Sequence, residues 1–137
     1  DFLDTNVLVY MFDRQAPGKQ ATAKQLVSQA LTNGSGVISF QVVQESLNTL
    51  TRKARTVMSP VDARVFLRDV LVPLWHVHPN AALYDRALQI QAKQGFSFYD
   101  SAIVAAALEA GCRRLLTEDL QHGQKVGSLR IENPFLP

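Results

Sequence analysis

The chain has 137 residues, 47% of them hydrophobic and 19% charged, which is the balance of one ordinary soluble globular domain spanning residues 1–137. Its only cysteine, Cys112, excludes an intramolecular disulfide, and its three histidines are too scattered for a zinc site. No apolar run reaches the roughly 20 residues of a membrane span, and a net charge of +2 alone indicates no partner. We expect a cytoplasmic protein without membrane attachment.

The first half of the chain alternates short apolar strands with longer amphipathic helices. The apolar pair in "FLD" is typical of the end of a buried strand, and "GVISF" at 36–40 of a second one. Segment 17–33 places its apolar residues on one helical stripe, and Gly34 suits its C-terminal cap. Segment 41–55 is predicted to be helical. Its last turn holds three basic residues: Arg52, Lys53 and Arg55.

The second half continues the same alternation. "SPVD" at 59–62 combines a serine N-cap, a proline at N1 and an acid at N3, which predicts a helix running to about residue 70. "LVPLWHV" at 71–77 is expected to be a strand or extended chain. Helices are predicted from about 80 to before Gly95 and from about 97 to before Gly111. "RRLLT" and "LRIEN" read as two last strands.

Strands separated by helices of ten or more residues require crossover connections, which indicates a parallel sheet covered on both faces. In such α/β folds the ligand site lies at the carboxyl ends of the strands. Asp4 stands at that edge, directly after the first strand. The sequence therefore places a carboxylate where a ligand is expected.

Four acidic residues, far apart in sequence, fall at this predicted edge. Asp4 and Asp119 each follow an apolar strand. Glu45 lies in the first turns of the helix after the second strand, and Asp100 heads the apolar stripe of its own helix. Each also has an ordinary structural explanation, because aspartates cap helices and turns, Asp100 can complete a capping box with Ser97, and glutamate favours solvated helices. Their shared location favours a common site.

Four carboxylates at close range raise one another's pKa values and need a counter-charge. A hard divalent cation supplies it, and oxygen-only ligands select Mg²⁺ or Mn²⁺ over zinc. Such an ion lowers the pKa of a bound water and neutralises charge on a phosphodiester. The chemistry implied is hydrolysis of a phosphate ester.

At this point the residues resemble a known family. "FLDTNVLVY", "QVVQESLNTLTRK", "GFSFYDSAIVAAALEAGC" and "LLTEDLQHGQ" resemble, in order and spacing, the motifs of PIN-domain ribonucleases and of the toxins of VapBC-type toxin–antitoxin pairs. The resemblance implies a three-layer α/β/α sandwich with a central parallel sheet. It also implies a metal-dependent endoribonuclease that cuts single-stranded or looped RNA and leaves a 5′-phosphate and a 3′-hydroxyl.

The resemblance also assigns roles to individual residues. Asp4, Glu45, Asp100 and Asp119 would be the catalytic acids and would hold Mg²⁺ or Mn²⁺. Thr5, Asn6 and Thr117 would orient carboxylates and waters around them. Partners implied in the same way are an RNA substrate, a cognate antitoxin whose C-terminal segment covers the site, and a second copy in a homodimer.

Some residues near the site keep two readings. Glu118 adjoins Asp119, and either could reach the metal; the motif position favours Asp119. Arg52, Lys53 and Arg55 could contact RNA, although cations are favoured at a helix C-terminus in any case. Aromatic residues flank Asp100 and could stack a base, but such residues more often belong to the core. These are Phe96, Phe98 and Tyr99.

Other functions compete with the nuclease. A haloacid-dehalogenase-type phosphohydrolase also places an aspartate after its first strand, but "DTN" lacks the second acid of its D-x-D motif. A receiver-type signalling domain would need an acidic pair there and an aspartate on a middle strand. The non-enzymatic alternative is a catalytically inactive PIN-like module that binds RNA or protein.

Overall fold

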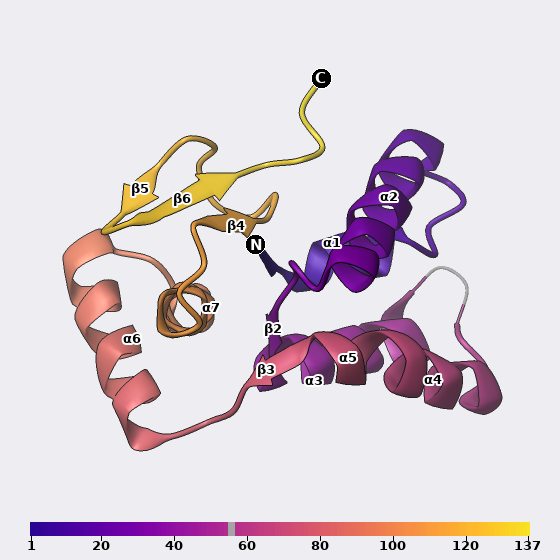
Figure 1. Ribbon diagram of the computed structural model, residues 1–137, viewed down its shortest axis with the longest axis horizontal. Helices are drawn as coiled ribbons and strands as arrows, with labels where there is room; N and C mark the ends of the chain where they lie inside the picture. Colours follow the sequence, from indigo (N-terminus) through magenta and orange to yellow (C-terminus); the bar gives the residue numbers. More distant parts are fainter. Residues whose placement is uncertain (55–56) are drawn as a thin grey trace.

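The sheet is built from short strands that lie side by side in a computed structural model describing residues 1–54 and 57–137 (Figure 1). The strands are β1 (Phe2–Leu3), β2 (Ile38–Ser39), β3 (Trp75–Val77), β4 (Arg114–Leu116), β5 (Lys125–Val126) and β6 (Leu129–Glu132). β1 pairs in parallel with β4, and β4 pairs in parallel with β6. On the other side a parallel bridge between Phe2 and Val37 leads to β2, which pairs in parallel with β3. The predicted parallel sheet is confirmed.

One strand departs from that pattern. β5 runs antiparallel to β6 at the edge of the sheet, and Gly127 turns the chain between them with a φ of 58°. β5 was not predicted from the sequence. A two-residue strand is too short to show a hydrophobic period.

Helices fill the segments between the strands. They are α1 (Thr5–Tyr10), α2 (Pro17–Asn33), α3 (Phe40–Asn48), α4 (Pro60–Phe66), α5 (Val72–Leu74), α6 (Ala81–Gln94) and α7 (Phe98–Glu109), with single π-helical turns η1 (Thr49–Lys53) and η2 (Leu67–Leu71). The predicted caps are present. The hydroxyl of Ser59 accepts a hydrogen bond from the backbone N–H of Asp62, and Gly34 and Gly95 end α2 and α6 in left-handed conformations.

The expectation of a strand or extended chain over 71–77 is wrong for its first part. The helical path begun by α4 continues through η2 and α5, and only Trp75–Val77 forms a strand. Because the helix continues, Phe66, Leu71 and Leu74 are all buried. The free energy gained by burying these side chains outweighs the preference of the segment for a strand. Helix α1 was not predicted either, because a segment of six residues is too short to show a helical stripe.

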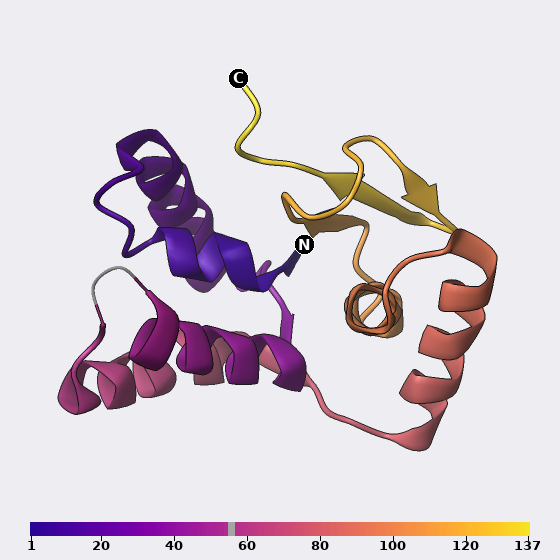
Figure 2. The same cartoon turned by 180° about the vertical axis from the view of Figure 1, so that it is seen from behind.

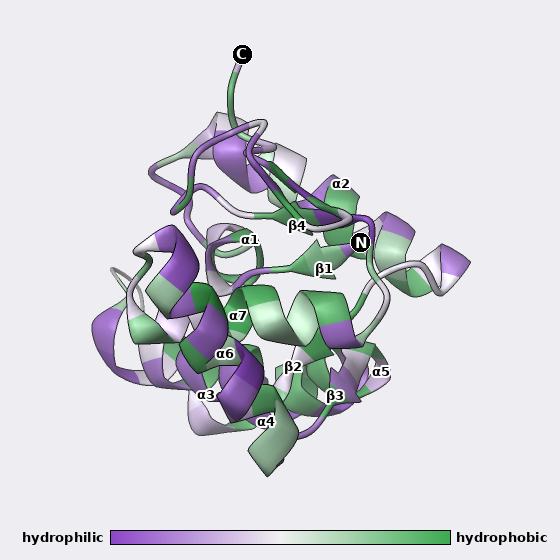
Figure 3. Ribbon diagram, turned by 90° about the vertical axis from the view of Figure 1, so that its left-hand side faces the viewer, coloured by the Kyte–Doolittle hydropathy of each residue, from purple (hydrophilic) through white to green (hydrophobic). Residues whose placement is uncertain are grey.

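Two groups of helices cover the two faces of the sheet. α1 and α2 lie on one side and α7 on the other, a relation that holds in both opposite views (Figures 1 and 2). α7 is apolar on nearly its whole surface and is buried from Ser101 to Ala107, whereas the more polar α6 covers it from outside (Figure 3). No helix in the described ranges is both long and apolar enough to span a membrane. The carboxyl ends of β1 and β4 lie beside the first turn of α1, because Asp4 caps this helix and Asn6 in it bonds to Thr117.

Candidate active site

Asp4 lies at the carboxyl end of β1 and caps α1. Its Oδ1 accepts a hydrogen bond from the backbone N–H of Thr5 at 2.7 Å, and its Oδ2 accepts one from Thr117 Oγ1 at 2.8 Å. Only 5% of the residue is exposed. Burial raises the pKa of Asp4 to about 7 against the opposing effect of these hydrogen bonds, and the charges of Asp119 and Glu45 raise it further. Asp4 is thus both the expected helix cap and a carboxylate that ionises with difficulty.

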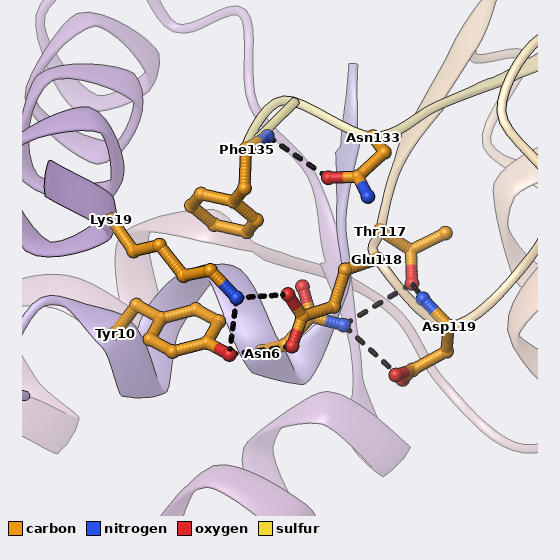
Figure 4. A network of polar contacts seen from close by, with 8 residues as sticks. All are labelled: Asn6, Tyr10, Lys19, Thr117, Glu118, Asp119, Asn133 and Phe135. Carbon is orange, nitrogen blue, oxygen red and sulfur yellow. Dashed lines mark hydrogen bonds and ion pairs between the residues drawn. The ribbon is translucent and has the colours of Figure 1, made fainter. Parts of the chain in front are cut away.

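Thr117, just after β4, links the residues around Asp4. Its buried hydroxyl donates to Asp4 and accepts from Asn6 Nδ2 at 3.2 Å and from the backbone N–H of Asp119 at 3.0 Å. Asn6 Nδ2 also donates to Asp119 Oδ2 at 3.1 Å (Figure 4). One hydroxyl and one amide therefore fix two carboxylates from different strands. The Oδ1 atom of Asn6 is buried and has no hydrogen-bond partner among the described residues.

Glu45 faces the same cluster from α3. Its Oε2 accepts a hydrogen bond from Thr5 Oγ1 at 3.4 Å, and its Oε1 accepts one from Gln41 Nε2 at 2.6 Å. Gln41 Nε2 also donates to the backbone carbonyl of Tyr99 at 3.2 Å, which ties Glu45 to the first turn of α7. Sequence reasoning missed Gln41. Its i, i+4 spacing from Glu45 on one helix was the signal available.

Asp100 and Asp119 complete the group. Asp100 occupies the first turn of α7, where its backbone N–H donates to the hydroxyl of the N-cap residue Ser97 at 3.1 Å. Burial raises the pKa of Asp119, the hydrogen bond from Asn6 opposes that rise, and the charges of Asp100 and Glu118 add to it. The charge of Asp100 therefore reaches Asp119, as those of Glu45 and Asp119 reach Asp4. Hydrogen bonds through Thr5, Asn6 and Thr117 link Asp4, Glu45 and Asp119, whereas Asp100 is linked to Asp119 by its charge alone.

These four carboxylates suit a cation in charge and donor type. None of them belongs to an ion pair within the part of the chain that the structure describes. Their oxygens are hard donors of the kind that Mg²⁺ and Mn²⁺ prefer. As the side chains stand, however, no three His, Cys, Asp or Glu residues in the described ranges are arranged to hold a metal ion. The chemical type of the ligands therefore fits a hard cation, but the positions of the side chains do not place three ligands around one point.

Glu118 turns away from the acidic group. Its Oε1 accepts a hydrogen bond from the Tyr10 hydroxyl at 2.6 Å, and its Oε2 forms an ion pair with Lys19 Nζ at 3.0 Å (Figure 4). Asp119, the next residue, points instead to Asn6. No local pattern points to Tyr10 or Lys19, because both reach Glu118 from helices that are distant in sequence.

The basic and aromatic candidates lie at the periphery. Arg52 and Lys53 are exposed at the end of η1, and Arg55 lies outside the described residues. Phe96 and Phe98 are partly buried against the core, as the more ordinary reading predicted. Tyr99 is 70% exposed beside Asp100, with its ring against that of Phe98 at 5.7 Å between centroids.

Two solved structures share this fold over most of the chain. FitAcB from Neisseria gonorrhoeae has a TM-score of 0.64 at 20% sequence identity, covering 98% of this chain and 97% of that one. VapC20 of Mycobacterium tuberculosis, described as a Sarcin-Ricin loop cleaving toxin, has a TM-score of 0.60 at 22% identity, covering 86% and 90%. At such identities the likeness concerns the fold.

None of the curated proteins compared with the chain matches its sequence. Residues 2–126 match the PIN domain family, a range that includes all four acids and both strands that end beside them. Because this match covers most of the chain, it excludes the haloacid-dehalogenase and receiver folds as alternatives. The chain belongs to the PIN domain family.

Proposed function

We propose that this chain is a Mg²⁺- or Mn²⁺-dependent endoribonuclease and the toxin of a toxin–antitoxin module. The observation that carries the proposal is that Asp4 and Asp119 follow the paired strands β1 and β4, that Glu45 and Asp100 act on them electrostatically, and that no cationic side chain pairs with any of the four in the described ranges. Membership of the PIN domain family supports it.

Each residue has a defined part in this proposal. The four carboxylates would hold the cation, which when bound lowers the pKa of a water and neutralises charge on the phosphodiester. Thr117 and Asn6, which are joined by a hydrogen bond, orient Asp4 and Asp119. The hydroxyl of Thr5 donates to Glu45 and orients it. The unpartnered Oδ1 of Asn6 offers an acceptor for a water at the site. No side chain has to act as a covalent nucleophile.

The proposal also requires the carboxylates to move. Since no three of them are now arranged to hold a metal, Asp100 and Glu45 would have to turn toward Asp4 and Asp119 when the cation binds. Asp100 is only partly buried, and it accepts no side-chain hydrogen bond among those of the described residues, so rotation breaks none of them. Affinity should therefore be modest and should favour Mn²⁺, which tolerates less regular geometry than Mg²⁺.

RNA is the proposed substrate, and a cognate antitoxin and a second copy of the chain are the proposed partners. The order of the four motifs supports a VapC-type toxin, and the fold is shared with a toxin described as cleaving the Sarcin-Ricin loop. Tyr99 is exposed beside Asp100 and is available to stack an unpaired base. The target sequence is not determined by these features.

A second candidate function is a PIN-like module that binds RNA or protein without cleaving it. The lack of three suitably arranged ligands among the described residues favours this alternative. It predicts that RNA binding, if present, is indifferent to Mn²⁺ and chelator. The nuclease proposal predicts the opposite.

The test is cleavage of structured cellular RNA by purified protein freed of any antitoxin. Reactions contain Mg²⁺, Mn²⁺ or chelator, and product ends are mapped for the native chain and for Asp100→Asn. We expect discrete cuts with 5′-phosphate ends that need metal and are absent from the variant. Cleavage by the native chain that survives in chelator, or equal cleavage by Asp100→Asn, would contradict the proposal.

A further inference from the structure

Glu118 sits in a closed triangle of polar contacts beside the acidic site. The Tyr10 hydroxyl donates to one carboxylate oxygen at 2.6 Å, and Lys19 Nζ contacts the other at 3.0 Å (Figure 4). Lys19 Nζ also donates to the Tyr10 hydroxyl at 3.1 Å, which closes the triangle. Both oxygens of Glu118 are therefore occupied by donors from α1 and α2.

Aromatic rings support this triangle. Lys19 Nζ lies 4.8 Å from the centre of the Tyr10 ring and 5.9 Å from that of Phe135, and the two rings meet edge to face at 4.9 Å. Phe135 belongs to the C-terminal segment, where its backbone N–H donates to Asn133 Oδ1 at 2.9 Å. Such cation–π and ring contacts restrict where Lys19 can place its charge.

The chain direction after β4 makes this triangle relevant to Asp119. Thr117, Glu118 and Asp119 are consecutive, and they bind in turn to Asp4, to the triangle and to Asn6. Fixing the middle side chain fixes the backbone on either side of it, so that Asp119 faces the acidic site while Glu118 cannot.

We propose that Tyr10, Lys19 and Glu118 form a clamp, here called the Glu118 clamp, that positions Asp119 as a metal ligand and keeps Glu118 out of the ligand set. The inference rests on the proposed metal-dependent function, and it makes all three members positioning residues. It assigns a role to three residues that neither the acidic motifs nor the family match supplies.

The alternative is that Glu118 can itself bind the metal, and that its contacts with Tyr10 and Lys19 prevent it from doing so. The two ideas predict opposite signs when the clamp is opened. Tyr10→Phe removes one hydroxyl without changing charge, and Lys19→Met removes a cation from beside an acidic site. If Glu118 is a withheld ligand, either variant would tighten metal binding, because Glu118 is released and, in Lys19→Met, a repelling cation is lost. If the clamp positions Asp119, either variant would weaken metal binding.

The experiment measures Mn²⁺ affinity of the purified full chain by calorimetry or by the electron paramagnetic resonance signal of free Mn²⁺. We expect binding to weaken about 10-fold in Lys19→Met and less in Tyr10→Phe, the size typical of residues that orient metal ligands. Lys19→Arg, which keeps the cation, should restore most of the affinity. Tighter or unchanged binding in Tyr10→Phe and Lys19→Met would overturn the clamp.

A second readout needs no metal. The backbone N–H of Asp119 bonds to Thr117 Oγ1 at 3.0 Å, so its hydrogen exchange reports the order of this segment. We expect faster exchange at Asp119 in Tyr10→Phe and in Lys19→Met, and no change in Arg68→Met, which breaks an exposed ion pair elsewhere. Unchanged exchange in the clamp variants would overturn the proposal.

The two readouts separate the two claims. If the native chain binds no Mn²⁺, the proposed metal-dependent function is wrong, and hydrogen exchange alone then decides whether the clamp orders Asp119. If the native chain binds Mn²⁺ and the clamp variants bind it equally well, the function stands and the clamp is wrong.

Discussion

Two groups of acidic side chains differ in how their charge is neutralised. On β4 and β6, Arg114 bonds to Asp1 at 2.6 Å and to Glu132 at 3.0 Å, and Arg130 pairs with Glu132 at 3.4 Å. At the carboxyl ends of β1 and β4, the hydrogen bonds that Asp4 and Asp119 receive from the described residues all come from neutral groups. Carboxylates paired with guanidinium groups already have their charge neutralised and stabilise the fold. Carboxylates that have no cationic partner can still bind a cation. The Glu118 clamp stands between the two cases, since it neutralises one acid next to the site.

The two groups of acids should differ most strongly in how their loss changes the rate of RNA cleavage. Asp100→Asn or Asp119→Asn should reduce RNA cleavage about 1000-fold or more, because several kcal/mol of charge stabilisation are lost with a metal ligand. Glu132→Gln removes an acid of the paired group and should leave the cleavage rate within a few-fold of native. Rates are measured on one mapped RNA at saturating Mn²⁺. Equal losses in all three variants would remove the distinction between the groups.

The second prediction concerns pH and stability. Burial raises the pKa of Asp4 from 3.8 to about 7, so between these values the folded state binds more protons than the unfolded state and stability falls as pH rises. Across this window the effect amounts to about 4 kcal/mol at roughly 1.4 kcal/mol per pKa unit. Asp4→Asn should abolish it, so that the variant gains stability relative to the native chain from pH 4 to pH 8 in metal-free urea unfolding.

Asp69 provides a control of opposite sign. Its hydrogen bond with Arg68 lowers its pKa, so its small contribution to stability is present above the pKa of the unfolded state and is lost as pH falls. Asp69→Asn should therefore cost a little stability at neutral pH. A native chain whose stability does not fall between pH 4 and pH 8 would contradict the assigned state of Asp4.

A single hydroxyl, that of Thr117, holds both Asp4 and the segment of Asp119. Thr117→Val removes the donor to Asp4 and the acceptor for Asn6 and for the backbone of Asp119. We expect a loss of about 1–3 kcal/mol in the free energy of unfolding and about 10-fold weaker Mn²⁺ binding. Thr117→Ser keeps the hydroxyl and should retain the affinity. If the valine variant bound Mn²⁺ normally, hydrogen bonds from Thr117 would not matter for the site.

The smallest effect is expected at exposed cations. In the described part of the chain, Arg52 and Lys53 pair with no acid, which makes them the inverse of the acidic site. Replacing both with alanine should raise KM for RNA several-fold with little change in kcat. Each lost phosphate contact should also reduce the slope of log affinity against log salt by about 0.7. An unchanged salt slope would show that these residues only stabilise the end of the helix.

Most of the alternation of strands and helices, and the parallel sheet, could be predicted from the sequence, whereas α1, β5 and the helical turns before β3 could not. Hydrophobic period, N-caps and C-terminal glycines are local signals, and strands linked by crossovers must share one carboxyl edge. Asp4 and Asp119 were readable for this reason, each as an acid directly after an apolar strand. The membership of the PIN domain family followed from the same motifs.

The directions of neighbouring side chains depend on contacts between elements and could not be predicted from the sequence. Glu118 and Asp119 are adjacent acids that the sequence could not rank by geometry, and contacts from Tyr10, Lys19 and Asn6 separate them. The continued helix over residues 67–74 and the bridge that Gln41 makes from Glu45 to α7 have the same origin. In each case the deciding partner lies on another element, and burial and hydrogen bonding between elements outweigh the preferences of the local segment.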